Sequence, residues 1–542
     1  MRKRFLPVLL LLVALPAGAA PNPRWPSLER QLAQDRVAPE SALAKLIAQN
    51  QDFHLLRAEE ANDHIRVPPW LRVLWRKQHP ETEFLPGDRS GGYPLVLKEI
   101  HEWMLSHQDL KRGRREQDSP PPKAVAVGAD VKISGEHTNP RSESDIRVNY
   151  WNPSQIIAAS NNITQSGAQA QFYSHDGGAT WGQTTLPFQR GDIFHSDPTV
   201  DWTSDGTAWT VTIGITDEFD LQLRAYKSRD GGVTWQFDGN VSGGQTGADK
   251  QMIWVDHSAT SRFKDNLYVI WHNGPRVYMN RRTPSGRWGE PILVSGRETQ
   301  GTGIGSDVKV SGDGTVFGFW PDTATSNLYF VRSTNGGVSY SKPKVIARTF
   351  GWYDIGVPAQ NRRRILIYTT GGAWRSGTKN LVYTAWTDLD GGPSCRHWTA
   401  EPYNNPNSPC RTRIWFSRST NGGKSWSRPR MISNPAGLND QFNPWMVVDE
   451  ATGALAIIYY DTFGESRART NIWYQSSFDD GVTWSTPYRV SSAASDTSGP
   501  GDDNQYGDYN GLSGIAGTFF PTWTDRRGNG EQIWTAPLID RQ

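Results

Sequence analysis

The stretch Tyr173-Ser-His-Asp-Gly-Gly-Ala-Thr-Trp181 decides the fold, because four further near-copies of it follow along the chain. They run from Ser228 to Trp235, Ser333 to Tyr340, Ser419 to Trp426 and Ser477 to Trp484. Every copy reads Ser-x-Asp/Asn-x-Gly-x-Thr/Ser-aromatic. A motif that recurs in this way predicts an array of repeated structural units.

The spacing between the aromatic residues measures the repeating unit. Trp181 and Trp235 are 54 residues apart, and the next intervals are 53 residues to Trp288 and 52 residues to Tyr340. Trp288 ends a degenerate copy of the motif. From residue 124 onward, short stretches rich in Val, Ile, Trp and Tyr alternate with Gly, Asn and Asp turns. This pattern indicates an all-β protein, and repeats of this length are typical of a β-propeller.

Similar strand pairs open seven units, of which the last ends after Gln532-Ile-Trp534 and lacks its final strand. A strand from Val125 to Ser134 can supply it and close the ring, which hides the edge strands of an open sheet. We therefore expect a β-propeller of seven blades over residues 124–542, or of six if the fifth start is misread. The expected starts are Ile146 to Ser160, Pro198 to Ile213, Gln251 to Trp271, Val308 to Trp320, Ile355 to Thr370, Phe442 to Tyr460 and Tyr509 to Trp523.

The interval from Tyr340 to Trp426 is 86 residues, which indicates one unit with an insertion. The two cysteines of the chain, Cys395 and Cys410, lie in this insertion. We expect them to form a disulfide, since two thiols without a nearby His pair make a poor zinc site. Closing a loop of about 15 residues stabilises a fold by roughly 3 kcal/mol in the chain-entropy model.

The N-terminal part differs from the rest of the chain. Arg2-Lys3-Arg4, an apolar run from Phe5 to Leu15 and Ala17-Gly-Ala19 predict a signal peptide over residues 1–20, hence a secreted or periplasmic protein. The apolar run is too short to cross a bilayer, so no membrane insertion is expected. Leucines at helical spacing predict a small helical segment over residues 21–118, and a Pro-rich linker follows over residues 119–123.

The charges of the chain nearly cancel, with 57 basic and 55 acidic side chains and a net charge of +2. Without a long basic stripe interleaved with aromatics, we expect no nucleic-acid partner. The run Lys111-Arg-Gly-Arg-Arg115 is interpreted as a solvated linker. We expect a monomer whose partner is a glycan or polysaccharide.

The repeated motif itself is interpreted as structural. Asp or Asn and Gly suit a tight turn, the Ser or Thr hydroxyl can bond the turn's backbone, and the aromatic ring can pack on the neighbouring sheet. Five near-copies cannot all be one active site, so Asp176, Asp230 and Asp479 are not expected to be catalytic acids. We expect the turns on the outer rim, each followed by the first strand of the next unit.

The motif Ser-x-Asp-x-Gly-x-Thr-Trp resembles the Asp-box, or BNR repeat, of the sialidase superfamily of β-propellers. The resemblance covers roughly residues 124 to 540. That superfamily implies the propeller fold, but it also includes other glycosidases, polysaccharide-acting enzymes and non-catalytic binding proteins. The fold alone therefore does not assign the function.

Residues at the start of each blade's first strand are expected to converge on one mouth of the central channel. An acidic residue recurs at every start. The simpler explanation for any one of them is that Asp caps a turn before a strand. As a set, crowded carboxylates would raise one another's pKa. The residues in question are Asp145 and Arg147, His195 and Asp197, Asp249 and Lys250, Asp307 and Lys309, Tyr353 and Asp354, Asp440 and Gln441, and Asp508 and Tyr509.

The resemblance implies roles at two of these starts. Asp145-Ile-Arg147-Val148 is similar to the Phe/Tyr-Arg-Ile-Pro strand of sialidases, which makes Arg147 the candidate clamp for a substrate carboxylate. Tyr509 stands where the family has its nucleophile. A phenol attacks poorly unless a carboxylate takes its proton, and Asp354 or Asp508 would replace the family's Glu in this role.

The chain also departs from the family's pattern. The Arg-Ile-Pro strand is incomplete, and Asn161-Asn162 stands where the family has its acid/base Asp. The other two clamp arginines are not identified. The available ones are Arg276, Arg281, Arg375 and Arg526.

Taken together, the residues predict an exported, sialidase-like glycoside hydrolase that acts on acidic glycans at the channel mouth. The catalytic candidates are Tyr509, Asp354, Asp197 and Asp249; the substrate-binding candidates are Arg147, Lys250, His195, Asp307 and Asp508. One alternative is a polysaccharide lyase or exo-glycosidase that uses His195 with a Tyr as base and acid. Another is a non-catalytic propeller that binds glycan or protein. No cofactor is expected, although carboxylates at an acidic mouth could hold calcium.

Overall fold

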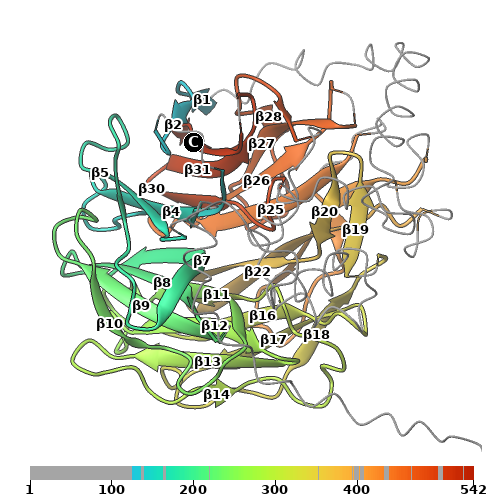
Figure 1. The fold of residues 1–542 in the computed structure, drawn as a ribbon. Helices are drawn as coiled ribbons and strands as arrows, with labels where there is room; N and C mark the ends of the chain where they lie inside the picture. Colours follow the sequence, from blue (N-terminus) through green and yellow to red (C-terminus); the bar gives the residue numbers. More distant parts are fainter. Residues whose placement is uncertain are drawn as a thin grey trace, which may run out of the picture.

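The computed structural model describes residues 125–541 except 136–139, 163–166, 219, 352, 393–394, 396–401, 403–407, 433–438, 466, 498–504 and 529. The described chain forms seven blade sheets, arranged around a central axis that we call the channel, and one separate two-stranded sheet (Figure 1). It contains no α-helix. The expected signal peptide, helical segment and linker lie outside the described residues.

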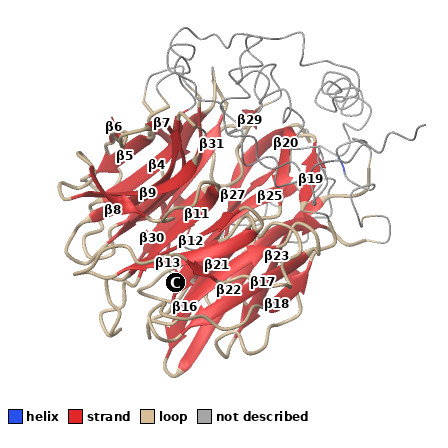
Figure 2. Ribbon diagram, turned by 60° about the horizontal axis from the view of Figure 1, so that its bottom comes forward, coloured by secondary structure: helices blue, strands red, loops and turns tan. Residues whose placement is uncertain are grey.

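Figure 2 shows the sheets and their connecting loops in a second view. Six blades each contain four antiparallel strands that follow one another in the sequence and pair in that order, and the last of these six has a short fifth strand. They are β3 (Arg141–Val148), β4 (Ile156–Asn162), β5 (Ala170–Ser174) and β6 (Gly182–Thr185); β7 (Asp192–Trp202), β8 (Ala208–Thr216), β9 (Leu221–Ser228) and β10 (Gln236–Asn240); β11 (Ala248–Val255), β12 (Leu267–Asn273), β13 (Arg276–Arg282) and β14 (Ile292–Leu293); β15 (Asp307–Val310), β16 (Val316–Pro321), β17 (Asn327–Ser333) and β18 (Lys344–Arg348); β21 (Thr369–Ser376), β22 (Lys379–Leu389), β23 (Thr412–Ser419) and β24 (Arg430–Met431); and β25 (Gln441–Val448), β26 (Leu455–Asp461), β27 (Arg469–Ser477) and β28 (Tyr488–Arg489), with β29 (Ser495–Asp496) beside β27.

The seventh blade is completed by the N-terminal end of the described chain. Its three inner strands are β30 (Gly511–Ile515), β31 (Thr518–Asp525) and β32 (Gln532–Thr535), and its outer strand is β2 (Val131–Lys132). β1 (Val125–Val127) pairs with the last strand, β33 (Leu538–Asp540). These pairings confirm both the seven-blade count and ring closure by the N-terminal strand.

The fifth predicted start was wrong. Residues 354–366 form a separate hairpin of β19 (Asp354–Val357) and β20 (Gln360–Leu366), and the inner strand of the fifth blade is β21 instead. Both segments are short apolar strands next to a tight turn, so alternation alone does not distinguish an extra hairpin from a blade. The hairpin is an insertion between the fourth and fifth blades.

Each Asp-box closes its own turn by hydrogen bonds. In the first copy, the Asp176 carboxylate accepts bonds from the Thr180 amide at 2.9 Å, the Thr180 hydroxyl at 2.5 Å and the Ser174 hydroxyl at 2.8 Å. The hydrogen bonds from Thr180, foremost its hydroxyl, lower the pKa of Asp176 to about 2. The turn joins the third strand to the outermost one, here β5 to β6. The expectation that the next blade follows directly is therefore corrected, because one short outer strand intervenes.

Buried acids join neighbouring blades near the channel. Asp145 accepts the Val200 amide at 2.9 Å and the Thr199 hydroxyl at 3.0 Å, which ties the first blade to the second. Asp307 accepts the Gly371 amide at 2.7 Å and ties the fourth blade to the fifth. Between the blades lie large, fully buried side chains such as Trp271. Acids at strand starts thus serve partly as structural links.

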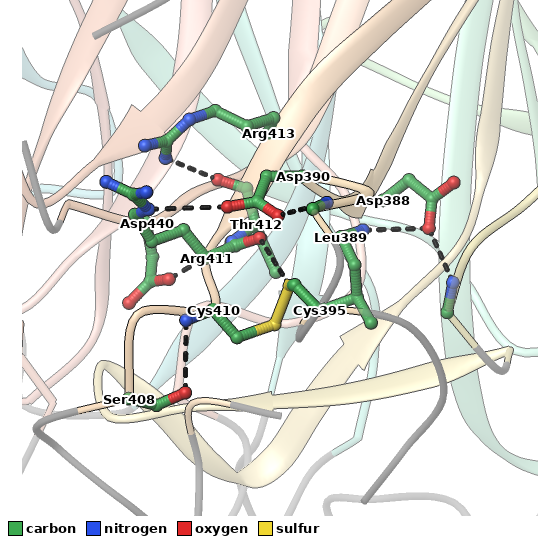
Figure 3. Close-up of a disulfide and its surroundings, with 12 residues drawn as sticks. Asp388, Leu389, Asp390, Cys395, Ser408, Cys410, Arg411, Thr412, Arg413 and Asp440 are labelled. Carbon is green, nitrogen blue, oxygen red and sulfur yellow. Dashed lines mark hydrogen bonds and ion pairs between the residues drawn. A yellow bond between two sulfur atoms is a disulfide. The ribbon is translucent and has the colours of Figure 1, made fainter. Parts of the chain in front are cut away.

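The predicted disulfide is present in the connection between β22 and β23 (Figure 3). Cys395 and Cys410 are buried, with Cα atoms 4.9 Å apart. The Arg467 guanidinium donates to the carbonyl oxygen of Cys410 at 3.1 Å and to the carboxylate of Asp440 at 2.9 Å. Asp440 therefore anchors the insertion at its blade and does not stand free at the mouth. The described residues include no helix long and apolar enough to cross a membrane.

Candidate active site at the channel mouth

Four inner strands carry a β-bulge at an equivalent place near their start. The register shifts occur between Ser142 and Asp145, Ser196 and Thr199, Asp249 and Met252, and Phe442 and Trp445. In each bulge one polar residue has a positive φ, with values of 56° for Glu143, 53° for Asp197, 50° for Lys250 and 48° for Asn443. Bulges re-aim side chains, and strained backbone of this kind clusters at functional sites. The strand starts define one end of the channel, which we call the mouth.

The inserted hairpin supplies an arginine to the mouth. Arg363 of β20 donates through Nε to Asp508 at 2.6 Å and through Nη2 to both Asp508, at 2.6 Å, and Glu143, at 2.8 Å. Its side chain is buried. Burial favours the neutral form, but the Asp508 and Glu143 carboxylates outweigh it and raise the pKa of Arg363. A cation with two carboxylates thus joins the hairpin to the first and seventh blades.

Glu143 is buried and accepts several hydrogen bonds. Besides Arg363, its donors are the Asp508 amide at 3.1 Å and the Asn161 side-chain amide at 2.5 Å. Burial raises the pKa of Glu143 to about 8, with Arg363 acting in the opposite direction. Asn161 also accepts the backbone amide of Asp197 at 2.7 Å. Asn161 therefore connects two of the bulges at the place where the sialidase pattern has an acid.

Lys250 lies in a cage of aromatic rings. Its Nζ is 3.7 Å from the ring centre of Tyr509, 5.3 Å from that of Tyr368 and 5.8 Å from that of Trp445. Within the described part of the chain its ammonium has no carboxylate at ion-pair distance, and its hydrogen-bond partner is the sulfur of Met252 at 3.2 Å. Burial lowers the pKa of Lys250, and the Asp197 carboxylate partly offsets this. The site thus holds a buried ammonium with spare hydrogen-bonding capacity.

Tyr509 is 2% exposed and packs 6.2 Å from Trp445, centre to centre. Burial raises the pKa of Tyr509 well above its usual value, and the charges of Asp197 and Glu143 add to this. The phenol is therefore neutral in the resting protein. It needs a base before it can act as a nucleophile.

Two half-buried acids flank the mouth on the second and third blades. Burial raises the pKa of Asp249 well above its usual value, and the Asp197 charge adds to it. The pKa of Asp197 is also raised by burial, but Lys250 and a 2.8 Å hydrogen bond from Ser196 oppose this shift. When the environments of two neighbouring acids differ in this way, one acid can donate a proton while the other acts as a carboxylate. Asp249 suits the role of proton donor, because its pKa is raised more clearly.

Of the sequence-predicted site residues, Asp197, Asp249, Lys250, Asp508 and Tyr509 interact electrostatically with one another at the mouth, and the charge of Asp307 also acts on Lys250. The other predicted site residues are held by different partners.

Arg147 and Asp307 lie further along the channel. The Arg147 guanidinium is 4.4 Å from the Trp254 ring centre and 3.5 Å from Asp201. Asp307 is paired with Lys309 at 2.6 Å. Lys309 in turn lies 4.4 Å from the Trp254 ring and 5.9 Å from the Trp445 ring. Arg147 and Lys309 thus share the Trp254 ring.

His195 and Asp354 are also separate from the carboxylate cluster. His195 packs inside the blades, with its Nε2 3.5 Å from the Tyr226 hydroxyl and its ring 4.7 Å from that of Phe188. Burial lowers the pKa of His195 to about 3. Asp354, in the hairpin, is paired with Arg364 at 3.2 Å.

Sequence reasoning missed Glu143, Arg363 and Tyr368. Glu143 stands two residues before Asp145 in the same strand. It could have been found from its position, but regular alternation does not reveal the bulge that turns its side chain to the mouth. Arg363 gave no signal, because its hairpin was read as a blade. The four arginines considered from sequence are engaged by other groups: Arg276 by Gly296, Arg281 by Gly336, Arg375 by Asp313 and Arg526 by Glu531.

Among the described residues, no group of three or more His, Cys, Asp or Glu side chains is arranged to hold a metal ion. The calcium alternative stays a prediction.

Residues 410–507 match the family model of the BNR repeat-like domain. This match covers the last two Asp-boxes, and the same turn recurs around the ring. The described chain is therefore a seven-bladed β-propeller, and its residues 410–507 are similar to BNR repeats.

Solved structures with a similar fold differ widely in sequence. The BP39L lectin from Burkholderia pseudomallei is 11% identical, over 73% of this chain and 96% of the lectin, with a TM-score of 0.47. The polysaccharide lyase Uly1 is 9% identical, over 76% and 94%, with a TM-score of 0.43. The Hadza microbial sialidase Hz136 is 13% identical, over 65% and 68%, with a TM-score of 0.39. No curated protein sequence matches the chain significantly.

Proposed function

We propose that this propeller is a glycoside hydrolase that acts on acidic glycans at the channel mouth. The observation that carries the proposal is the meeting of three groups at the strand starts: the Tyr509 phenol, the carboxylates of Glu143, Asp197 and Asp249, and the caged ammonium of Lys250, 3.7 Å from the Tyr509 ring. A nucleophile, acids and a cation are the components that hydrolysis of an anionic glycoside requires.

The substrate class follows from the cation. The Lys250 ammonium has no carboxylate partner at ion-pair distance among the described residues, whereas Arg363 is held by Asp508 and Glu143. A sugar carboxylate would supply the charge that Lys250 lacks. The rings of Trp445 and Tyr368 lie 5.8 and 5.3 Å from the same ammonium, and aromatic rings suit the apolar face of a sugar.

The residues can be assigned to the steps of a retaining reaction. The Tyr509 oxygen attacks the anomeric carbon while the Glu143 carboxylate takes the phenolic proton. The bond to the leaving oxygen breaks, its electron pair goes to that oxygen, and Asp249 supplies the proton. Water then attacks the glycosyl-tyrosine, the Asp249 carboxylate takes the proton of the water, and Glu143 returns a proton to the released phenolate. Asp197 lies beside Lys250, whose charge opposes the rise in the pKa of Asp197.

A substrate panel tests the proposal. Fluorogenic glycosides of sialic acid, glucuronic acid and galacturonic acid are incubated with the purified protein, with the matching neutral glucoside and galactoside as controls. We expect release of the fluorophore from at least one acidic glycoside and not from the neutral ones. Tyr509→Phe should abolish this release, while Tyr506→Phe, whose hydroxyl bonds the Ser495 carbonyl, should retain it. Absence of turnover on all acidic glycosides would refute the hydrolase.

A specific observation favours a second candidate, a glycan-binding propeller without catalysis. The Arg363 guanidinium is already held at the mouth by two carboxylates, so it does not offer a clamp for a substrate carboxylate. A binding protein would retain affinity for the acidic sugar in Tyr509→Phe and would release no product.

The lyase predicted as an alternative from the sequence would need His195 at the mouth, whereas His195 packs inside the second blade against Phe188 and Tyr226. The unsaturated products of a lyase would absorb in the ultraviolet, whereas a hydrolase would give none.

We also propose that the protein is exported. The disulfide between Cys395 and Cys410 supports an oxidising compartment. Mass spectrometry of the protein from the culture medium or periplasm should find an N-terminus at about residue 21. A full-length cytoplasmic chain would contradict export.

A further inference from the structure

The end of the channel opposite the mouth contains a cavity of about 250 Å³. Its walls come from the far ends of the inner strands of five blades, whereas the mouth is formed by the strand starts. The lining residues are Tyr150, residues 256–260, 310–312 and 373–375, and Glu450.

A fixed ion network forms one wall of this cavity. His257 is bonded through Nε2 to Asp201 at 3.0 Å and through Nδ1 to Glu450 at 2.9 Å. The ring of Tyr150 stacks on the His257 ring, with centres 6.0 Å apart and planes 11° apart. The centre of the Trp254 ring lies 5.5 Å from the centre of the His257 ring. Each group is held by others, so the wall is formed before any ligand arrives.

The charges of the cavity disfavour an anion. The two cations, His257 and Arg375, are already paired with Asp201, Glu450 and Asp313. A further acid, Asp256, accepts a hydrogen bond from the Ser261 hydroxyl at 2.5 Å. Four acids thus surround two compensated cations. The remaining polar groups are carboxylate oxygens and hydroxyls, such as that of Ser258, beside the aromatic side chains of Tyr150 and Trp374.

We propose that this cavity is a second, non-catalytic binding site for a neutral sugar. Aromatic walls with a few fixed polar groups are the usual composition of small-ligand sites. The volume lies just below that of pockets for drug-sized molecules, so it suits one sugar ring. Carboxylates and hydroxyls can accept and share the hydrogen bonds of sugar hydroxyls.

The two ends of the channel are separate sites. Lys309 lies between the Trp254 ring, 5.5 Å from His257 at the cavity, and the Trp445 ring, 5.8 Å from Lys250 at the mouth. The inference therefore does not depend on the proposed hydrolase activity. A chain with one site at each end could hold two parts of one polymer.

The test uses the full exported chain and ligand-observed NMR with calorimetry. The probes are the methyl glycosides of glucose, galactose and mannose. Methyl glucuronide serves as the anionic control, and methylamine serves as the cationic control. We expect at least one neutral glycoside to bind, and methyl glucuronide and methylamine to bind this site at least tenfold more weakly.

Variants place the bound probe. Trp374→Ala and Thr260→Trp should each weaken neutral-sugar binding at least tenfold; Thr260 is exposed, so filling the cavity from this position does not disturb the core. Val338→Trp, at a 54% exposed position on the outer rim, and Tyr509→Phe, at the mouth, should leave binding unchanged. No binding of any neutral glycoside, binding that survives Thr260→Trp, or preference for methylamine or glucuronide would overturn the proposal.

Discussion

At the scale of the residue, two acids that are neighbours in the sequence have different tasks. Glu143 and Asp145 stand two residues apart on β3, but the bulge between them changes where each side chain goes. Asp145 bonds the second blade and is structural. Glu143 turns to the mouth, where it meets Arg363 and Asp508. A one-residue bulge is not readable from alternation, which is why Asp145 and not Glu143 was selected from sequence.

The first prediction concerns Glu143 as the base for Tyr509. Because the carboxyl must be ionised to accept a proton and its pKa is raised to about 8, turnover should rise as the pH increases through about 8. Glu143→Gln should lower turnover by roughly 10² to 10⁴ and remove this limb of the pH profile. The exposed Glu290→Gln serves as the matched control and should leave the profile intact. An unchanged profile in Glu143→Gln would exclude this role.

At the scale of the element, the inserted hairpin β19–β20 builds half of the mouth's polar network. Gln360 donates to the Gly507 carbonyl at 3.0 Å, and the backbone amide of Arg363 donates to Gln505 at 3.1 Å. Together with the Arg363 ion pairs, these bonds hold the hairpin against the segment that precedes β30. The hairpin therefore positions Asp508, next to Tyr509.

The second prediction concerns Arg363. Arg363→Met leaves two buried carboxylates without their cation, so it should lower the free energy of unfolding by roughly 3–5 kcal/mol. Arg375→Met removes a pair whose side chains are 35% and 30% exposed, and should cost at most about 1 kcal/mol. Urea unfolding of both variants measures the difference. Equal losses would show that the mouth network contributes no more than a surface ion pair.

The sequence allowed the fold to be predicted more completely than the site. The spacing of the Asp-boxes allowed the blades to be counted and showed that the last blade lacks one strand. This worked because the hydrogen bonds within each turn, such as those of Asp176, are local and recur at fixed offsets. The strand starts share one end of the channel, and this allowed four site residues to be predicted: Tyr509, Asp197, Asp249 and Lys250. Arg363 was not, since an insertion breaks the repeat, and Glu143 was not, since a bulge changes the side-chain direction. Both residues were missed because their positions depend on contacts between segments that are distant in the sequence and not on the local repeat.

At the scale of the whole molecule, His257 links blades that lie far apart in the sequence. It belongs to the third blade, and its partners Asp201 and Glu450 belong to the second and the sixth. Burial opposes its charged form, but the two carboxylates raise the pKa of His257 from 6.5 to about 10. The ring is thus fastened by strand pairing at the seventh blade and by this ion network at the far end of the channel.

The third prediction follows from the sign of this shift. Between pH 6.5 and about 10, His257 is protonated in the folded chain and neutral in the unfolded one, so unfolding releases a proton and rising pH favours it. The stabilisation is complete below pH 6.5 and is lost as the pH rises through about 10, by at most about 1.4 kcal/mol per pH unit.

Denaturant unfolding at a series of pH values measures this slope. His257→Gln should flatten it relative to the wild type, while His175→Gln, at an Asp-box turn, should not. Parallel slopes for the wild type and His257→Gln would rule out the linkage.

The most direct measurement of the central claim is to trap the glycosyl intermediate on Tyr509. The protein is incubated with a glycosyl fluoride of the acidic sugar released in the substrate panel, carrying a second fluorine beside the anomeric carbon to slow hydrolysis. Peptide mass spectrometry then locates the label. The account expects one sugar per chain on the peptide that contains Tyr509, and no label in Tyr509→Phe. A chain that turns over the substrate but carries no label, or carries it on another residue, would contradict the account.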